Sequence, residues 1–371
     1  MVAMCIVLLT QYRQVFMKTD QHECLPNNKV HERVPASPPI DENVHQFTKT
    51  QATVEYYQNN TRVHIIIIAR MSTGSTAMGS MLGKVENSLY VYEPDHLFLK
   101  FVYHKNVYVD RASYLKEMQP RLCTFFEELY QCAFASNDYL DGLNKCVLYR
   151  RKGQSLQYLS YPISKRELTS FCRSKANIIS KVLRFVDIES CLPTLKENKV
   201  KLIFLARDPR GMVTSRLRRW DRFLTPLAAV SNANYYPTKA IVKEHCDWLT
   251  MVYNLLQNAS KWLRDNSMLI RFEDMCQYPD VINQAVYDFV GLAPSSLGVG
   301  KPHNISLASW LNIYSYPELK EIQDYCPRHV YDDFGWRRVN SKEEFERAKA
   351  SPSWYHDIPA GRVALKYKIP S

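Results

Sequence analysis

Two stretches of the chain contain residues of the types that bind anions. The first is RMSTGST, residues 70–76, where hydroxyl side chains and one glycine follow an apolar run. Free N–H groups and the positive end of the dipole make a helix N-terminus favourable for a negative ligand, and hydroxyl groups add donors. Glycine lets the backbone come close to that ligand. An ordinary β–α connection with a serine N-cap is the alternative. On the anion-binding interpretation, the contacts would come from Ser72, Thr73, Gly74, Ser75 and Thr76.

This loop differs from the phosphate-binding loop of ATP- and GTP-hydrolysing proteins. A Walker loop would need glycine in place of Ala69 and lysine in place of Ser75. The missing lysine argues against hydrolysis of ATP or GTP, and it disfavours a nucleotide kinase.

The second stretch is KLIFLARDPRGMVTSRLRR, residues 201–219. Arg207 follows an apolar strand, the next proline stops the strand's hydrogen-bond ladder, and we expect a helix from about Gly211. Ser215 lies one to two turns into that helix, on a side that can face back to the end of the strand. A guanidinium fork together with a hydroxyl group suits a phosphate. The alternative is that Arg207 pairs with Asp208 or another nearby acid.

Buried strands and helices must position these residues. The segments Val63–Ala69, apolar except for His64, and Leu202–Ala206 are apolar runs, which are typical of strands covered on both faces. In an open α/β sheet, ligands bind beyond the carboxyl ends of the strands. Lys181 and Arg184 lie in a third apolar run, and we interpret them as solvated ends. The remaining predicted elements are strands at Leu89–Tyr92, Ala176–Phe185 and Met268–Phe272, and helices at Ser75–Leu82, Tyr114–Cys132, Ile188–Leu195, Thr238–Leu263 and Pro279–Val290.

Charge and cysteine content narrow the class of partner and the compartment. The chain has 371 residues, a formal net charge of +11 and a pI of about 9.0, which favours an anionic partner. The sequence has no block of like charges and no zinc-type cysteine spacing, which weakens nucleic acid as a partner. Ten cysteines without a metal-binding pattern predict scattered disulfides. N-glycosylation triplets at Asn59, Asn258 and Asn304 also favour the secretory pathway.

The two ends of the chain differ from its middle. Met1–Leu9 is apolar, but the run is shorter than the roughly 20 residues of a spanning helix. We interpret residues 1–19 as the tail end of a truncated membrane anchor; a slightly apolar soluble N-terminus is the alternative. Residues 20–60 are polar and contain several prolines, so we predict a stem or linker. Residues 341–371 are interpreted as a C-terminal tail.

The order of the motifs resembles one enzyme family. STGST after a strand is followed by YEP, LIFLARDPRGMVTSR, a helix with HCDW, and IRFEDMCQYPDVINQAVYDFVGL. This order is similar to that of the Golgi carbohydrate sulfotransferases, in the group that sulfates O6 of galactose, N-acetylgalactosamine or N-acetylglucosamine. The resemblance runs from about Val63 to Trp336 and predicts a sulfotransferase domain at residues 61–340. It implies a P-loop-like α/β fold, an open and mainly parallel sheet flanked by helices.

The resemblance also implies a sulfonate donor, 3′-phosphoadenosine 5′-phosphosulfate, and no metal. The family's first loop holds the 5′-phosphosulfate, which would fall to residues 72–76 here. Its second motif holds the 3′-phosphate, which would fall to Arg207 and Ser215. One position departs from the family. An arginine usually stands two residues before the loop glycine, where this chain has Ser72, and Arg70 could substitute for it.

A base should activate the acceptor hydroxyl near the donor sulfur. The YEP triplet matches an FEP triplet of the family, which favours Glu93 as that base. His96 is the second candidate, although the family's histidine lies one residue further on. A structural contact is the alternative for each: a helix cap or an ion pair for Glu93, and a solvent-facing role for His96.

We therefore predict transfer of a sulfonate to a sugar hydroxyl, at O6, of a glycan such as chondroitin or keratan. The expected protein is a glycosylated type II membrane protein of the Golgi whose catalytic domain is luminal. Two alternatives stay open. One is a catalytically weak luminal protein that binds glycans and retains the fold. The other is a sulfotransferase that acts on heparan-type chains or on protein tyrosine.

Overall fold

The computed structural model describes residues 62–95, 111–145, 156, 159, 162–217, 238–294, 307 and 309–351. His96, the expected anchor at 1–19 and the expected stem at 20–60 lie outside these residues, as do two of the glycosylation triplets. None of the helices in the described ranges is both long and apolar enough to cross a membrane.

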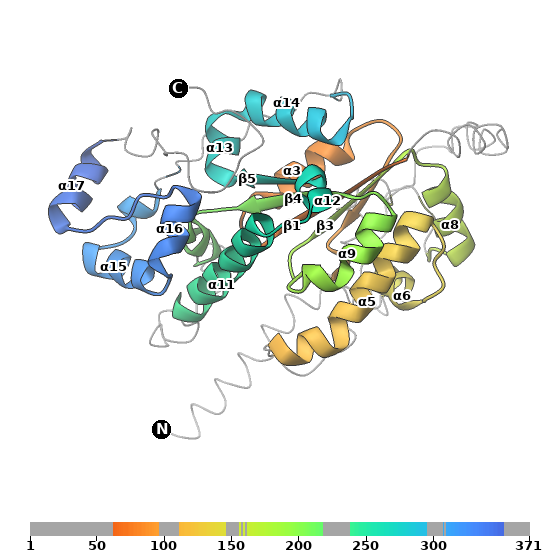
Figure 1. Ribbon diagram of the computed structural model, residues 1–371, viewed down its shortest axis with the longest axis horizontal. Helices are drawn as coiled ribbons and strands as arrows, with labels where there is room; N and C mark the ends of the chain where they lie inside the picture. The colour runs from red at the N-terminus through yellow and green to blue at the C-terminus, as the bar shows by residue number, and fades with distance from the viewer. Residues whose placement is uncertain are drawn as a thin grey trace, which may run out of the picture. The chain divides into compact units, whose positions relative to one another are not determined.

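A five-stranded sheet forms the centre of the fold, with the strand order β2-β3-β1-β4-β5 (Figure 1). Strand β4 pairs in parallel with β1 on one side and with β5 on the other. The four isoleucines of β1 have no exposed surface, because both faces of the strand are covered. The mainly parallel α/β sheet predicted from the sequence is therefore confirmed. The strands are β1 Val63–Ala69, β2 Ser88–Tyr92, β3 Asn177–Val182, β4 Lys201–Ala206 and β5 Ser267–Arg271.

Helices flank this sheet. Those at 75–83, 111–131, 188–197, 238–257 and 279–290 lie where the sequence predicts a helix, and several others were not predicted. The helices are α3 Ser75–Gly83, α5 Arg111–Gln131, α6 Asp138–Lys145, α8 Lys165–Arg173, α9 Ile188–Glu197, α11 Thr238–Gln257, α12 Lys261–Asn266, α13 Phe272–Gln277, α14 Pro279–Val290, α15 Tyr316–Asp324, α16 Arg328–Phe334 and α17 Lys342–Ala350, with a further helix at 209–217 and a 3-10 turn, η3, at Ser309–Asn312.

Two predicted helix boundaries were wrong. The helix expected over Thr238–Leu263 is two helices, because the Ser260 side chain accepts a hydrogen bond from the Leu263 N–H and starts α12. The helix expected from about Gly211 already begins at Pro209. Proline suits the first turn of a helix, where its missing N–H would have no partner inside the helix.

The chain divides into two compact units, and the first comprises residues 1–62 and 87–178. In its described part, the ring of Phe125 on α5 lies 4.5 Å from that of Tyr139 on α6, centroid to centroid. A disulfide between Cys132 and Cys172 joins the end of α5 to α8. The domain limits of 61–340 proposed from the sequence stay a prediction.

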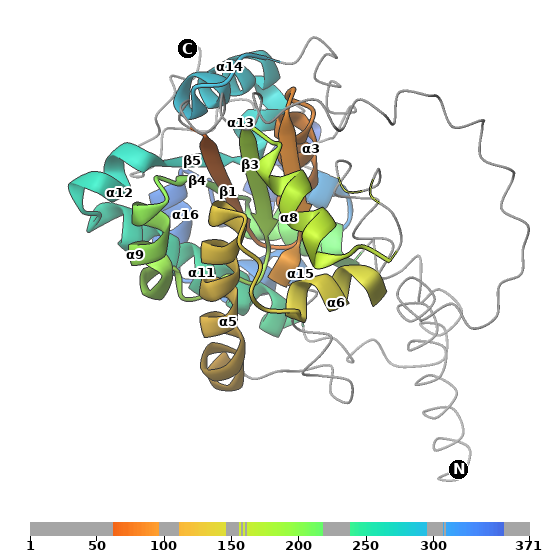
Figure 2. The same ribbon diagram turned by 90° about the vertical axis from the view of Figure 1, so that its right-hand side faces the viewer.

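The second unit comprises residues 63–86 and 179–371 and carries β1, β4, β5 and the helices from α9 onward. Helices α13 and α14 follow β5 and lie next to each other (Figures 1 and 2). A disulfide between Cys246 and Cys326 links α11 to the turn after α15. Phe345 of α17 is buried in an apolar cluster with Trp310. The first half of the segment interpreted as a tail therefore contains a helix that packs in this unit.

Candidate active site

The first candidate anion-binding stretch connects β1 to α3 in a loop that ends on a glycine. Gly74 caps α3 with φ of 86°. A Cβ atom at this position would lie 2.6 Å from the Phe272 ring and 2.7 Å from the Met275 methyl carbon. The loop backbone therefore lies directly against α13. Thr73 is fully buried, and its hydroxyl donates to the Arg70 carbonyl at 2.7 Å. That hydroxyl shapes the loop, so only the backbone N–H of Thr73 could serve a ligand.

The second stretch reaches this loop through Arg207. Its Nη1 donates to the Ser72 carbonyl at 2.6 Å, which joins residues that are far apart in the sequence. Ser72 has φ of 70°, a left-handed conformation that is uncommon outside glycine. The carbonyl of Ser72 thus holds the guanidinium of Arg207 beside the loop. The two motifs expected to bind one ligand lie together in the second unit.

The Arg207 side chain is held on further sides. Its guanidinium carbon lies 4.0 Å from the centroid of the Phe272 ring, a cation–π contact. A Cβ on Gly211 would come within 3.3 Å of the Arg207 Nε, so this glycine leaves the arginine its space. Arg207 is only 8% exposed. A buried arginine with a fixed fork is suited to a phosphate group.

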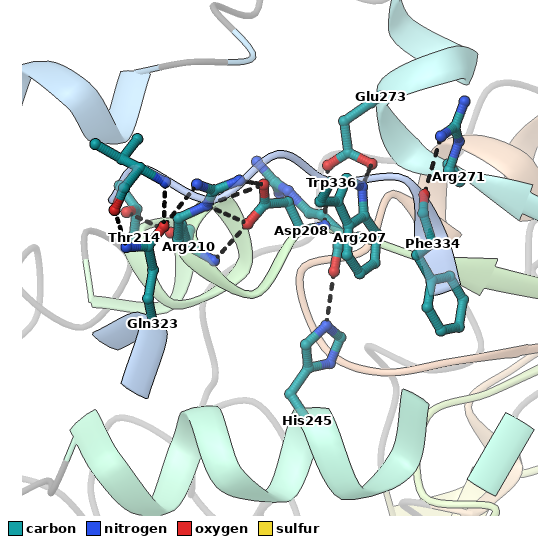
Figure 3. A network of polar contacts seen from close by, with 11 residues as sticks. Arg207, Asp208, Arg210, Thr214, His245, Arg271, Glu273, Gln323, Phe334 and Trp336 are labelled. Atoms are coloured by element: carbon teal, nitrogen blue, oxygen red, sulfur yellow. Dashed lines mark hydrogen bonds and ion pairs between the residues drawn. The ribbon is translucent and has the colours of Figure 1, made fainter. Parts of the chain in front are cut away.

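The sequence left open whether Arg207 pairs with Asp208. In the structure, Asp208 forms an ion pair with Arg210 instead. The Asp208 carboxylate accepts from the Arg210 Nε at 2.9 Å and from its Nη2 at 2.6 Å (Figure 3). Both side chains are buried. The Arg210 guanidinium lies 4.3 Å from the Trp310 ring centroid and also donates to Gln323. Asp208 therefore has a structural ion pair.

Lys181 was interpreted as a solvated end, and that interpretation was wrong. It lies on β3 with no exposed surface, and its Nζ donates to the Thr76 hydroxyl at 3.3 Å. This contact brings a buried cation to the first turn of α3, where the positive end of the helix dipole lies. A lysine between the apolar residues of a predicted buried strand was the signal for this placement. Arg184, its companion in that interpretation, is half-buried.

His245 and Glu273 support the backbone of the second motif, and neither was singled out from the sequence. The Nε2 of His245 lies 2.9 Å from the Arg207 carbonyl oxygen. Burial lowers the pKa of His245 to about 3, so its ring is neutral at pH 7. Glu273 accepts from the Asp208 N–H at 3.0 Å, and burial followed by the nearby Asp208 charge raises its pKa to about 7. Figure 3 shows both contacts at the end of β4.

Arg70, the suggested substitute for the family's loop arginine, has protein partners. Its guanidinium forms an ion pair with Glu244 on α11, and its Nη1 lies 3.4 Å from the Leu183 carbonyl oxygen. Ser75 is buried in the first turn of α3. Ser215 is half-buried in the helix at 209–217. The roles of these residues toward a ligand remain predictions.

Glu93, the proposed base, belongs to the first compact unit. It comes directly after the last residue of β2, is 7% exposed and has φ of 43°. A left-handed backbone at a residue with a large side chain is a form of local strain that clusters at functional sites. His96 lies outside the described residues. Within the described ranges, no group of three or more histidine, cysteine or acidic residues is arranged to hold a metal ion.

Comparison with known proteins identifies the family. The family model described as the sulfotransferase domain matches residues 62–358. Carbohydrate sulfotransferase 1 of Danio rerio is 22% identical over 362 residues, covering 80% of this chain and 83% of the relative. Human carbohydrate sulfotransferase 6 is 21% identical over 330 residues, covering 76% of this chain and 83% of the relative.

Two solved structures are also similar. The sulfotransferase domain from the curacin biosynthetic pathway is 16% identical, with a TM-score of 0.37, and covers 78% of this chain and 97% of its own. Mouse sulfotransferase SULT7A1 complexed with PAP is 9% identical, with a TM-score of 0.35, and covers 78% of this chain and 89% of its own. Because the family model spans most of the sequence, the chain belongs to the sulfotransferase domain family.

Proposed function

We propose that this sulfotransferase transfers a sulfonate group from 3′-phosphoadenosine 5′-phosphosulfate to a sugar hydroxyl, at O6, of a glycan such as chondroitin or keratan. The family supports the reaction class. The relatives named carbohydrate sulfotransferases support the glycan acceptor.

One observation carries the proposal. Two buried cationic side chains meet the β1–α3 connection: Lys181 of β3 contacts the first turn of α3, and Arg207, directly after β4, contacts the preceding loop. Both side chains place positive charge beside the start of α3. The free N–H groups and dipole at the start of α3 favour an anion in the same place. A donor with a phosphosulfate at one end and a phosphate at the other fits this set of groups.

The roles of the residues follow from their charges. When bound, the donor supplies a sulfonate on a phosphate leaving group. Lys181 and the backbone N–H groups of the loop would stabilise the negative charge that develops on that phosphate. Arg207 and Ser215 would hold the 3′-phosphate. Glu93 would take the proton of the acceptor hydroxyl as its oxygen bonds to sulfur, with His96 as the second candidate.

The compartment is part of the same proposal. The disulfides Cys132–Cys172 and Cys246–Cys326 are typical of proteins that fold in an oxidising compartment. Asn258 is exposed between α11 and α12, where a glycan could be attached. These features support a Golgi glycoprotein with a luminal catalytic part. Attachment to the membrane through residues 1–19 belongs to this proposal.

A transfer assay tests the function directly. The purified protein is incubated with ³⁵S-labelled donor and separate desulfated chondroitin, keratan and heparan chains, and donor binding is measured by calorimetry. We expect label on chondroitin or keratan. Lys181→Met should abolish most of the transfer. Lys261→Met is the matched control, because Lys261 is exposed and pairs only with Asp265 along α12 in the contacts that the structure describes.

The same assay separates the alternatives. Label on heparan chains alone would refute the proposed acceptor. Donor binding without transfer to any chain, or to a tyrosine peptide, would favour the catalytically weak glycan-binding protein. Absence of donor binding in the folded wild-type protein would refute the proposal as a whole.

A further inference from the structure

Directly after β4, the peptide unit between Arg207 and Asp208 has a side-chain contact at its carbonyl and another at its N–H. The carbonyl of Arg207 and the N–H of Asp208 belong to the same planar unit and point in opposite directions. His245 on α11 contacts the carbonyl at 2.9 Å, and Glu273 on α13 accepts from the N–H at 3.0 Å. Two helices therefore fix the orientation of one peptide plane (Figure 3).

Each of the two contacts requires a defined chemical state. A carbonyl oxygen can only accept, so the Nε2 of His245 must carry the hydrogen. Glu273 uses both carboxylate oxygens, since its Oε1 accepts from Asp208 and its Oε2 accepts from the Trp336 indole N–H at 3.2 Å. Both side chains are buried, His245 at 1% and Glu273 at 2% exposed. Their positions leave little freedom for the plane to turn.

The orientation of this plane controls where Arg207 points. The Cα of Arg207 belongs to this peptide plane. Its guanidinium lies at the far end of a long side chain, beside Ser72 and Phe272. A small rotation of the plane is therefore magnified at the guanidinium. A misplacement of about 1 Å in a binding group can cost roughly 100-fold in function.

We propose that His245 and Glu273 are positioning residues that hold the 207–208 peptide so that Arg207 can bind the 3′-phosphate of the donor. The inference rests on the proposed function, because it assigns Arg207 to that phosphate. It predicts a selective effect. Loss of either the His245 or the Glu273 hydrogen bond should weaken the protein's contacts with the 3′-phosphate and leave its contacts with the rest of the nucleotide unchanged.

Nucleotide binding tests this inference without catalysis. Calorimetry gives the Kd of 3′-phosphoadenosine 5′-phosphate and of adenosine 5′-phosphate, which lacks the 3′-phosphate. The Kd of adenosine 5′-phosphate divided by that of 3′-phosphoadenosine 5′-phosphate is the ratio that measures 3′-phosphate recognition. We expect His245→Leu and Glu273→Gln to lower this ratio at least ~10-fold, the scale of a lost hydrogen bond to a charged group. His245→Gln should restore part of it, because its amide N–H can donate to the carbonyl.

The control for Glu273→Gln is Glu128→Gln in the first unit. Glu128, like Glu273, is a buried carboxylate that accepts two N–H hydrogen bonds; both of its donors are backbone groups, Ala135 at 3.1 Å and Ser136 at 2.7 Å. Its variant should leave the ratio unchanged even if the protein becomes less stable. If Glu273→Gln does not fold, the two His245 variants carry the test.

The possible outcomes are distinct. A wild-type protein that binds the two nucleotides equally, or neither of them, would overturn the proposed function and this inference with it. A wild-type protein that prefers the 3′-phosphate, together with unchanged ratios in the His245→Leu and Glu273→Gln proteins, would overturn the inference alone. Equal losses for both nucleotides would show a structural role only and would also overturn it.

Discussion

Replacing Gly74 by alanine tests how tightly the anion-binding loop is packed. Gly74 ends the loop with φ of 86° and caps α3, whose Ala77 N–H donates to the Gly74 carbonyl at 3.0 Å. An alanine Cβ would lie 2.6 Å from the Phe272 ring and 2.7 Å from the Met275 methyl carbon. Real Cβ atoms do not approach other atoms so closely, so the loop or the side chains of Phe272 and Met275 must move.

The expected magnitude has two parts. The left-handed backbone costs a residue with a Cβ about 1–2 kcal/mol. Overpacking against Phe272 and Met275 adds roughly 1–3 kcal/mol. We therefore expect Gly74→Ala to lower the free energy of unfolding by about 2–5 kcal/mol in total.

Gly291→Ala separates the two parts. Gly291 ends α14 with φ of 72°, but a Cβ there would meet no atom within 4 Å. This variant should lose only the backbone part, about 1–2 kcal/mol. It should also leave nucleotide binding unchanged, whereas Gly74→Ala should weaken the binding of 3′-phosphoadenosine 5′-phosphate, because the displaced loop carries the proposed phosphosulfate contacts.

Urea unfolding followed by circular dichroism measures both variants, with the binding constants from calorimetry. Equal losses of stability in the two glycine variants would show that Phe272 and Met275 yield at no cost. Unchanged nucleotide affinity in Gly74→Ala would remove this loop from the site. Either result would refute the reasoning from the close approach of the loop to α13.

Further predictions concern the charged residues. Arg207→Ala should weaken the binding of 3′-phosphoadenosine 5′-phosphate by about one to several kcal/mol, as expected for lost charged hydrogen bonds, and unchanged affinity by calorimetry would exclude this arginine from the site. Glu93→Gln should leave donor binding nearly intact and slow turnover at least ~100-fold, and normal turnover in the transfer assay would exclude Glu93 as the base. Burial raises the pKa of Glu273 from 4.5 to about 7, so the folded state binds more protons than the unfolded state between these values. The free energy of unfolding of the wild type relative to Glu273→Gln should therefore fall as the pH rises through this window, by on the order of 3 kcal/mol. Urea titrations across the same pH range would contradict this if the difference stayed constant.

The sequence was sufficient where the controlling forces are local. The apolar runs of β1 and β4 predicted buried strands, because a strand covered on both faces needs no polar alternation. Proline at the start and Gly291 at the end predicted the limits of α14. The motif order, taken as a resemblance, pointed to the family that the comparison then showed. The strand and helix signals each lie within a short segment, and the motif order needs only the linear sequence.

Only the tertiary structure decided the partners of the charged side chains. Lys181 is buried against the Thr76 hydroxyl, Asp208 pairs with Arg210, and Glu273 holds the Asp208 N–H. The local sequence pattern does not predict these partners. Each contact depends on how separate strands and helices pack, and on which polar groups are buried away from water by that packing. The sequence thus determined the strands, the main helices and the family, while the packing determined which cations face the proposed donor site and which side chains hold Arg207.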